Sequence, residues 1–265
     1  MTKIAVAGAA GRMGRAIISL CQGRAEMQVS AALECTDSEF IGVDAGEIAG
    51  VGNIRVPVTD DLSAADFDVL IDFTNPGATV QHVNACAVGG KRTVIGTTGL
   101  SDRDRRQIES AAAKVAIMLA PNMSVGVNLC LRLLQIAAQT IGDDTDIEII
   151  EAHHRHKVDA PSGTALRMGE VIAATLGVEL SERAVYARQG AIGARPAGAI
   201  GFSTIRAGEI VGDHTVLFVS AGERVEISHR AASRETFAGG AVRAARWIVD
   251  QPPGLYDMQD VLGFR

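Results

Sequence analysis

The sequence predicts an α/β protein, in which a doubly wound parallel sheet is joined to a second, α+β domain with a mixed sheet. Three observations support this fold class. Short runs rich in Val, Ile and Ala alternate with helical segments over the first half of the chain. A glycine-rich turn follows the first of these runs. Between residues 184 and 229, strand-like runs follow one another without long helices, which is typical of an antiparallel or mixed sheet.

The composition narrows the function classes. Hydrophobic residues make up 47% of the 265 residues and aromatic residues only 4%, which favours tightly packed α/β layers over a base-stacking surface. The formal charge of −6 and the pI of about 5.5 argue against a general nucleic-acid partner. They leave an anionic substrate open, because a local basic pocket is enough to bind one.

The cysteines and the N-terminus indicate the compartment. The chain has four isolated cysteines, which are Cys21, Cys35, Cys86 and Cys130. Their spacing fits no disulfide framework, so reduced thiols are expected. The N-terminus leads directly into a strand, which predicts no signal peptide, and no apolar run is expected to approach the roughly 20 residues of a membrane helix. We expect a cytoplasmic protein with no membrane partner.

The first 22 residues carry a dinucleotide-binding pattern. Residues 3–7 form a buried strand, Gly8-Ala9-Ala10-Gly11-Arg12-Met13-Gly14 forms a turn, and apolar residues then recur at helical spacing. Strand, glycine turn and helix in this order are typical of a Rossmann-like fold. We expect Gly8 to permit the tight turn, Gly11 to let the backbone approach a pyrophosphate, and Gly14 to allow close helix–strand packing.

The second strand, residues 27–33, ends at Glu34. A carboxylate at this place accepts hydrogen bonds from the adenosine ribose and repels a 2′-phosphate. The sequence therefore favours NADH as the cofactor, while Arg12 leaves NADPH open.

The remaining elements follow from hydrophobic runs and turn residues. Residues 39–61 read as a loop with one short strand at 54–58, and Gly96-Thr97-Thr98-Gly99 as a loop at the carboxyl end of a strand. Further strands are predicted at 67–73, 93–96, 115–119, 147–150, 184–187, 200–207, 214–219 and 224–229. Helices are predicted from residue 76, at 101–114, at 125–141, after residue 164 and at 236–249.

The segment Glu151–Thr164 is the strongest candidate for chemistry. It holds three of the six histidines, His153, His154 and His156, followed by Lys157 and by a helix start in which Ser162 or Thr164 can cap. A helix N-terminus beside a lysine and imidazoles can hold a small anion and move a proton. Two alternatives are a solvated basic loop and a zinc site. The zinc alternative is weak because no cysteine is near and no HExxH or CxxC pattern occurs, so no metal site is predicted.

Four segments resemble one known family. They are the glycine turn from Val6, Val-Ile-Gly-Thr-Thr-Gly from Val94, Ala-Pro-Asn-Met-Ser-Val-Gly-Val-Asn from Ala120, and the histidine segment with its Ala-Pro-Ser-Gly-Thr tail. Phe-Ala-Gly-Gly-Ala-Val-Arg-Ala-Ala from Phe237 adds to the match. In this order they resemble 4-hydroxy-tetrahydrodipicolinate reductase (dihydrodipicolinate reductase), an enzyme of the diaminopimelate route to lysine.

The resemblance implies reduction of 4-hydroxy-tetrahydrodipicolinate, a cyclic dicarboxylate, to tetrahydrodipicolinate with NAD(P)H. It implies that His153 donates or accepts the proton, that Lys157 is a second acid and pairs with a substrate carboxylate, and that His154, Gly163 and Thr164 bind substrate. The implied cofactor contacts are Gly8, Ala9, Ala10, Gly11, Arg12, Met13, Glu34, Gly96, Thr97, Thr98, Ala120, Pro121, Asn122 and Met123.

The resemblance also implies the domain organisation. The last helix returns to the first domain, so the dinucleotide-binding domain comprises residues 1–124 with 234–265. Residues 125–233 form the substrate-binding and oligomerisation domain, with hinges near 120–125 and 229–234. A homotetramer assembled through the second sheet is expected.

The chain departs from the family pattern at one place. An arginine commonly follows the ribose-binding acid in members that use both cofactors, and Cys35 stands there. His156 and Asp159 have no assigned role, although Asp159 is placed to orient Lys157, and Arg234 is a candidate for extra positive charge. Two other classes remain: an aspartate-semialdehyde-type dehydrogenase, which needs a nucleophilic cysteine in a polar turn, and a dinucleotide sensor without turnover, which has no need of His153 and Lys157.

Overall fold

The computed structural model describes residues 1–63, 65–233 and 235–265. The chain divides into two compact units, Met1–Val125 with Glu235–Arg265 and Gly126–Arg234. The first unit is therefore built from both ends of the chain.

A seven-stranded sheet forms the centre of the first unit, and every pairing in it is parallel. The strand order is β12-β6-β5-β4-β1-β2-β3. The strands are β1 (Thr2–Ala7), β2 (Met27–Leu33), β3 (Val58–Thr59), β4 (Val69–Asp72), β5 (Arg92–Ile95), β6 (Ala116–Leu119) and β12 (Gly254–Tyr256). Chain order runs outward in both directions from β1 and β4, which confirms the predicted doubly wound sheet and places a topological switch point there.

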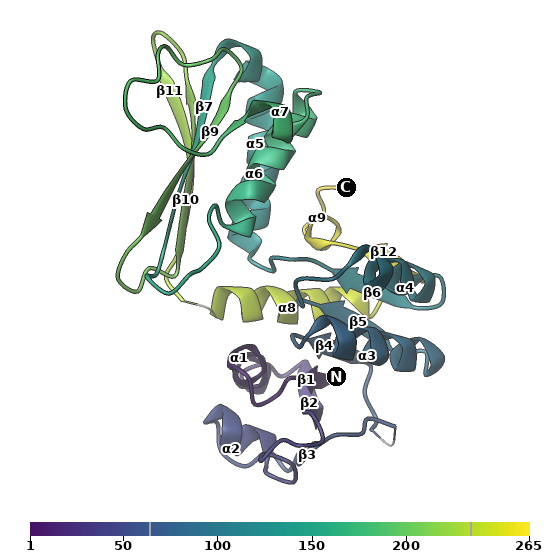
Figure 1. The fold of residues 1–265 in the computed structure, drawn as a ribbon. Coiled ribbons are helices and arrows are strands. Elements are labelled where there is room, and N and C mark those ends of the chain that lie inside the picture. The colour runs from purple at the N-terminus through teal and green to yellow at the C-terminus, as the bar shows by residue number, and fades with distance from the viewer. Residues whose placement is uncertain (64, 234) are drawn as a thin grey trace. The chain divides into compact units, whose positions relative to one another are not determined.

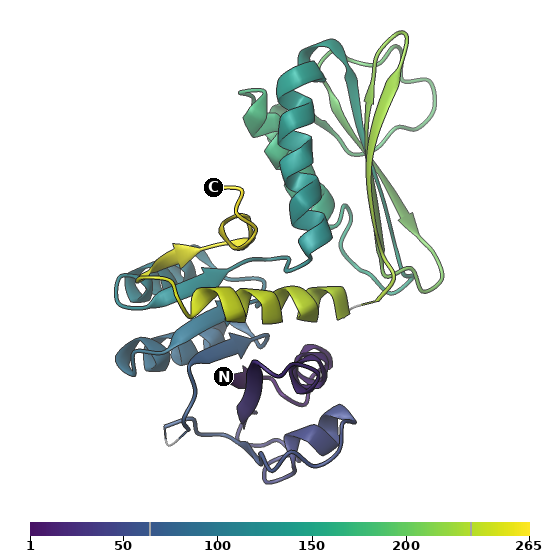
Figure 2. The same ribbon diagram turned by 180° about the vertical axis from the view of Figure 1, so that it is seen from behind.

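Helices cover both faces of this sheet (Figures 1 and 2). They are α1 (Arg12–Gln22), α2 (Ala45–Ala49), α3 (Pro76–Val88), α4 (Asp102–Ala112), α8 (Glu235–Ile248) and α9 (Met258–Val261). Apolar residues of α1 and α8 pack in one core with Val69 and Ile71, while α3 packs with Leu70 in a core on the other face. Because successive strand residues point to opposite faces, β4 serves both cores and is buried throughout.

The second unit holds a five-stranded sheet of order β11-β10-β7-β9-β8. Strand β10 is antiparallel to both of its neighbours, whereas β7, β9 and β8 are parallel, so the sheet is mixed as predicted. The strands are β7 (Asp146–His153), β8 (Ala184–Val185), β9 (Ile200–Arg206), β10 (Gly212–Val219) and β11 (Arg224–Ala231). The helices are α5 (Val125–Ile141), the 3-10 turn η1 (Gly142–Asp144), α6 (Gly163–Thr175) and α7 (Leu180–Arg183).

Helices α5 and α6 lie together on one face of the second sheet (Figures 1 and 2). Leu134 of α5 and Met168 of α6 share a core with Ile149 of β7 and Phe218 of β10. No helix among the described residues of this unit covers the opposite face, from which Ile150, Ile205 and Leu217 project.

Among the residues that the structure describes, one segment is long and apolar enough to cross a membrane, namely α5 with its following turn, Val125–Asp144. The expectation that no apolar run approaches this length overlooked it. Cys130, Leu134 and Ala138 on this helix pack into the core of the second unit.

The structure corrects the predicted loop at residues 39–61. This stretch contains α2, and its strand is β3, not residues 54–58. Asp44 is the N-cap of α2, and its carboxylate also accepts hydrogen bonds from the backbone N–H groups of Ile54 and Val56. One side chain thus organises a segment that has no apolar periodicity. This is why the hydrophobic pattern of the sequence did not reveal α2. The short elements α7, β12 and α9 were not predicted either.

Candidate functional site

The predicted cofactor contacts all follow strands of the first sheet. The glycine turn follows β1, Glu34 follows β2, Gly96, Thr97 and Thr98 follow β5, and Ala120–Met123 follow β6. Since these strands are parallel, their carboxyl ends form one edge, and ligands of such sheets bind at that edge near the switch point. The structure therefore brings these segments to one side of the sheet.

The glycine turn has the geometry of an anion-binding turn. Gly8 has a φ of +73°, which glycine adopts without steric cost. A Cβ at Gly14 would lie 2.1 Å from the backbone oxygen of Gly8, so a side chain there would push α1 away from the turn. Gly11 is the N-cap of α1 and has no side chain to cap the helix. The backbone N–H groups at this helix N-terminus can therefore bind an anion. The residues thus fit a dinucleotide pyrophosphate.

Glu34 is tied to this turn. One of its carboxylate oxygens accepts a 2.8 Å hydrogen bond from the backbone N–H of Ala10. Cys35 is exposed beside it. Arg15 contacts the same turn, because its Nε donates to the Ala10 carbonyl at 2.7 Å. An anion is therefore held at the point where a ribose is expected.

Sequence reasoning missed a buried carboxylate at the same edge. Asp72, the last residue of β4, is fully buried and accepts hydrogen bonds from the hydroxyls of Thr74, Thr79 and Thr97. Its second oxygen lies 2.8 Å from Nδ1 of His82. The carboxylate links the loops that follow β4 and β5, and its position at the end of an apolar strand was the signal available in the sequence.

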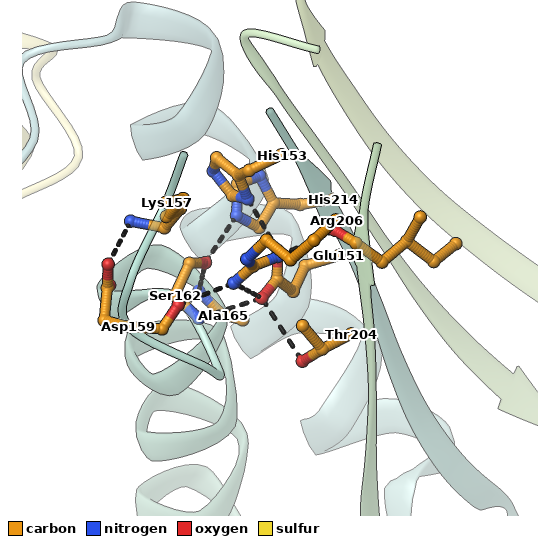
Figure 3. Close-up of polar contacts among 10 residues, drawn as sticks. Glu151, His153, Lys157, Asp159, Ser162, Ala165, Thr204, Arg206 and His214 are labelled. Atoms are coloured by element: carbon orange, nitrogen blue, oxygen red, sulfur yellow. Dashed lines mark hydrogen bonds and ion pairs between the residues drawn. The ribbon is translucent and has the colours of Figure 1, made fainter. Parts of the chain in front are cut away.

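The histidine segment begins at the end of β7, in the second unit. Glu151 and His153 are two residues apart on this strand, so both point toward the helix-covered face. Nδ1 of His153 lies 2.6 Å from a carboxylate oxygen of Glu151 (Figure 3). Glu151 is 1% exposed and His153 is 9% exposed. A buried carboxylate–imidazole pair therefore stands beside the start of α6.

Glu151 has three further partners (Figure 3). Arg206 at the end of β9 donates to both carboxylate oxygens, at 2.7 and 2.8 Å. The Ser162 N–H donates at 3.1 Å and the Thr204 hydroxyl at 3.3 Å. Burial by itself would raise the pKa of Glu151, but the hydrogen bonds from Arg206, His153 and Ser162 outweigh it and lower that pKa. Glu151 is ionised at neutral pH.

The pKa of His153 is lowered. Burial is the largest cause, and the charges of Lys157 and Arg206 act in the same direction, while Glu151 opposes them. The imidazole is therefore neutral at neutral pH.

A second buried imidazole lies next to this pair. The ring of His214, on β10, meets that of His153 edge to face at a centroid distance of 5.1 Å. Its Nε2 is 2.9 Å from the hydroxyl of Ser162, which is the N-cap of α6 and one of the two caps expected there. Burial, with His153 adding to it, lowers the pKa of His214 to about 4.

The other predicted site residues lie in the adjoining loop and helix. His154 directly follows β7, and Gly163 and Thr164 open α6. The ammonium of Lys157 is 2.8 Å from the carboxylate of Asp159, which supports the expected orienting role of Asp159. The exposed His156 ring lies 6.2 Å from that of His154. Arg234 lies outside the described residues.

Three residues of this cluster were missed in the sequence: Glu151, Arg206 and His214. Glu151 carried a signal, because a residue two positions before His153 on a strand shares its face. The sequence held no such signal for Arg206 and His214. Only the strand register places Arg206 opposite His153 and His214 opposite Glu151.

The buried histidines predict an acid-labile fold. Unfolded histidine binds a proton near pH 6.5 and folded His214 only near pH 4, so the unfolded state binds more protons between these values. The free energy of unfolding should fall as the pH drops through this window, by up to about 3 kcal/mol from His214. Urea unfolding at pH 7 and pH 5 measures this. In a His214→Gln variant the free energy of unfolding should depend less steeply on pH. A control variant at the exposed His156, His156→Gln, should show the same pH dependence as the parent protein. Equal slopes in all three would contradict the assignment.

Comparison with models of known protein families shows to which family this chain is related. The family description "Dihydrodipicolinate reductase, N-terminus" matches residues 2–123, and "Dihydrodipicolinate reductase, C-terminus" matches residues 126–262. The chain belongs to the dihydrodipicolinate reductase family. It is an oxidoreductase that reduces 4-hydroxy-tetrahydrodipicolinate in lysine biosynthesis, and its N-terminal unit is the NAD(P)-binding one.

Solved structures agree in fold. A dipicolinate-bound dihydrodipicolinate reductase from Paenisporosarcina sp. TG-14 is 24% identical with a TM-score of 0.77, and the match covers 97% of each chain. An amine dehydrogenase from Mycobacterium smegmatis is 13% identical with a TM-score of 0.61, over 96% of this chain and 94% of that one. A probable dehydrogenase from Thermotoga maritima is also 13% identical, with a TM-score of 0.62 over 96% and 91% of the two chains.

Proposed function

We propose that the cluster at the start of α6 is where this reductase binds its substrate and delivers the proton. The observation that carries the proposal is the buried His153–Glu151 pair next to Lys157 and the α6 N-terminus. In this proposal His153 and Lys157 are catalytic.

The substrate is a cyclic dicarboxylate. The relative from Paenisporosarcina was solved with dipicolinate, which supports a ligand of this shape and charge. The N–H groups and hydroxyl of Gly163 and Thr164 at the α6 N-terminus hold one carboxylate, Lys157 pairs with a carboxylate, and His154 contacts the substrate. The helix N-terminus and the lysine ammonium together match a dianion.

Loss of water from 4-hydroxy-tetrahydrodipicolinate gives a conjugated system, to which bound NAD(P)H supplies a hydride. The position next to the attacked carbon then needs a proton, which His153 delivers and Lys157 assists. The dianion offsets the charges of Lys157 and Arg206, so its arrival raises the pKa of His153 and favours the protonated ring. Substrate binding thus prepares the donor.

The cofactor contacts proposed are the glycine turn 8–13, Glu34, Gly96–Thr98 and Ala120–Met123. The hydrogen bond between Glu34 and Ala10 holds an anion where a 2′-phosphate would lie, which supports NADH over NADPH.

The proposed domain roles follow. Residues 1–124 with 234–265 bind the dinucleotide, and residues 125–233 bind substrate and assemble a homotetramer. The helix-free sheet face with Ile150, Ile205 and Leu217 supports assembly, because an apolar sheet face gains stability when a second sheet covers it. Four free cysteines support a reducing, cytoplasmic setting.

The first experiment follows loss of NADH absorbance, and separately that of NADPH, with freshly generated 4-hydroxy-tetrahydrodipicolinate. We expect faster oxidation of NADH. Tight NADH binding without oxidation would instead favour the sensor alternative, and a higher rate with NADPH would refute only the cofactor preference.

A Cys35→Arg variant tests the origin of this preference. A guanidinium beside Glu34 can bind a 2′-phosphate, and a hydrogen bond to a charged group contributes about 1.5–3 kcal/mol. We expect kcat/KM for NADPH to rise by about tenfold or more, while the NADH value of the same variant serves as the internal control. An equal change for both cofactors would argue against a 2′-phosphate contact at this position.

A further inference from the structure

The carboxylate of Glu151 is surrounded by donors from four residues: Arg206, Ser162, Thr204 and His153. Arg206 binds it with both terminal nitrogens and is itself held by the carbonyl of Asp159 at 2.6 Å. Bidentate guanidinium–carboxylate pairs fix orientation as well as charge. The side chain of Glu151 is therefore held in one orientation and is ionised at neutral pH.

An ionised carboxylate only accepts hydrogen bonds. At 2.6 Å from Glu151, Nδ1 of His153 must carry the hydrogen, and the neutral ring then has its lone pair on Nε2. A second proton can enter or leave the ring only at Nε2.

The Nε2 edge of the His153 ring faces a glycine at the start of the neighbouring strand. Gly212, at the start of β10, lies beside it, and a Cβ there would be 3.1 Å from Nε2. Within residues 1–63, 65–233 and 235–265, no hydrogen bond to this nitrogen is formed. One edge of the imidazole is thus anchored and the other is free for a ligand.

We propose that Glu151, bound by the guanidinium of Arg206, is a positioning residue that keeps hydrogen on Nδ1 of His153 and directs Nε2 to the substrate. This inference rests on the proposed proton transfer by His153. Glu151 does not touch the substrate and acts through the imidazole.

The same strand provides a matched control. Glu148, three residues earlier on β7, is also bound by both terminal nitrogens of an arginine, Arg188, at 2.7 and 2.8 Å. It contacts a second arginine, Arg195, and its partners among residues 1–63, 65–233 and 235–265 include no histidine. Replacing either glutamate by glutamine removes the charge of one arginine-bound carboxylate on β7, but only Glu151→Gln affects the imidazole.

The direct test uses the unaltered enzyme. Two-bond ¹H–¹⁵N correlation spectra distinguish the protonated from the bare ring nitrogen, and His153→Gln assigns the signals by their loss. We expect the Nδ1–H tautomer at pH 7.5 in the parent and in Glu148→Gln, and a mixture or the Nε2–H form in Glu151→Gln. A parent enzyme with His153 mainly in the Nε2–H form overturns the proposal.

The pH–rate profile tests the consequence. Loss of the anion at residue 151 makes protonation of His153 harder, so the limb on which kcat falls with rising pH should move to lower pH. We expect kcat of Glu151→Gln to fall by roughly 10²-fold, the scale of a general acid–base contribution, with a smaller change in KM. Glu148→Gln should keep the parental limb.

The outcomes separate the two claims. A fully active His153→Gln variant refutes the proposed function of His153. The positioning role alone is refuted by a different result. In that result His153→Gln loses activity, but Glu151→Gln and Glu148→Gln both keep the pH dependence of kcat seen in the parent enzyme.

Discussion

Replacement of Lys157 by alanine is expected to lower kcat by roughly 10²- to 10³-fold, the effect of losing one preorganised donor to the transition state, or about 2.7–4 kcal/mol. Lys157 is held by Asp159 at 2.8 Å, so its ammonium is placed before the substrate arrives. The loss should appear in kcat and in KM, because the same ammonium pairs with a substrate carboxylate. Steady-state oxidation of NADH measures both constants.

The matched control for this variant is Arg155→Ala. Arg155 is an exposed cation in the same loop, and it is anchored through its backbone N–H to the Gly208 carbonyl, a bond that the substitution keeps. Its removal changes the loop charge by the same amount without touching the proposed donor. Equal losses in the two variants would mean that Lys157 contributes only general positive charge.

The second large effect is expected in the last helix, where Gly240→Ala should destabilise the fold and Gly239→Ala should not. A Cβ at Gly240 would lie 1.8 Å from the backbone oxygen of Met123, which cannot rotate away. Overpacking of this kind costs about 1–3 kcal/mol, and more where only backbone is present to move. Gly239, its neighbour on α8, has no atom within 4 Å of the added Cβ. There, alanine should gain up to about 1 kcal/mol from helix propensity.

Chemical unfolding of both variants measures the difference in stability, and titration with NADH adds a functional measurement. Because Met123 belongs to the proposed cofactor segment Ala120–Met123, Gly240→Ala should also weaken NADH binding, whereas Gly239→Ala should leave it unchanged. Equal stability of the two variants would show that the Met123 loop yields freely. Loss of stability with unchanged NADH affinity would separate this loop from the cofactor site.

Local signals in the sequence located most of the longer elements to within a few residues. The strand at residues 27–33 and the helix at residues 125–141 are confirmed at both ends. The Ser101 cap of α4 and the possible Ser162 cap of α6 are confirmed by their side-chain hydrogen bonds. Caps and hydrophobic periodicity act within a few residues of the chain, so they can be recognised without the fold.

Only part of the candidate site could be predicted from such local signals in the sequence. His153 and Lys157 stood out because they are crowded within one short segment. Glu34 stood out because it ends a strand after a glycine turn. By contrast, α2 was missed, since Asp44 joins residues up to 12 positions away through hydrogen bonds that leave no periodic pattern.

Tertiary structure alone decided the electrostatics of the site. Arg206 and His214 reach Glu151 and Ser162 across 55 and 52 residues, through the registers of β9 and β10 with β7. Those registers decide that Glu151 is ionised, that His153 carries hydrogen on Nδ1, and that the pKa values of His153 and His214 are lowered. The sequence names the groups that can exchange a proton. Burial and strand pairing decide which of them holds it, because a charge in a protein interior is set by its spatial neighbours.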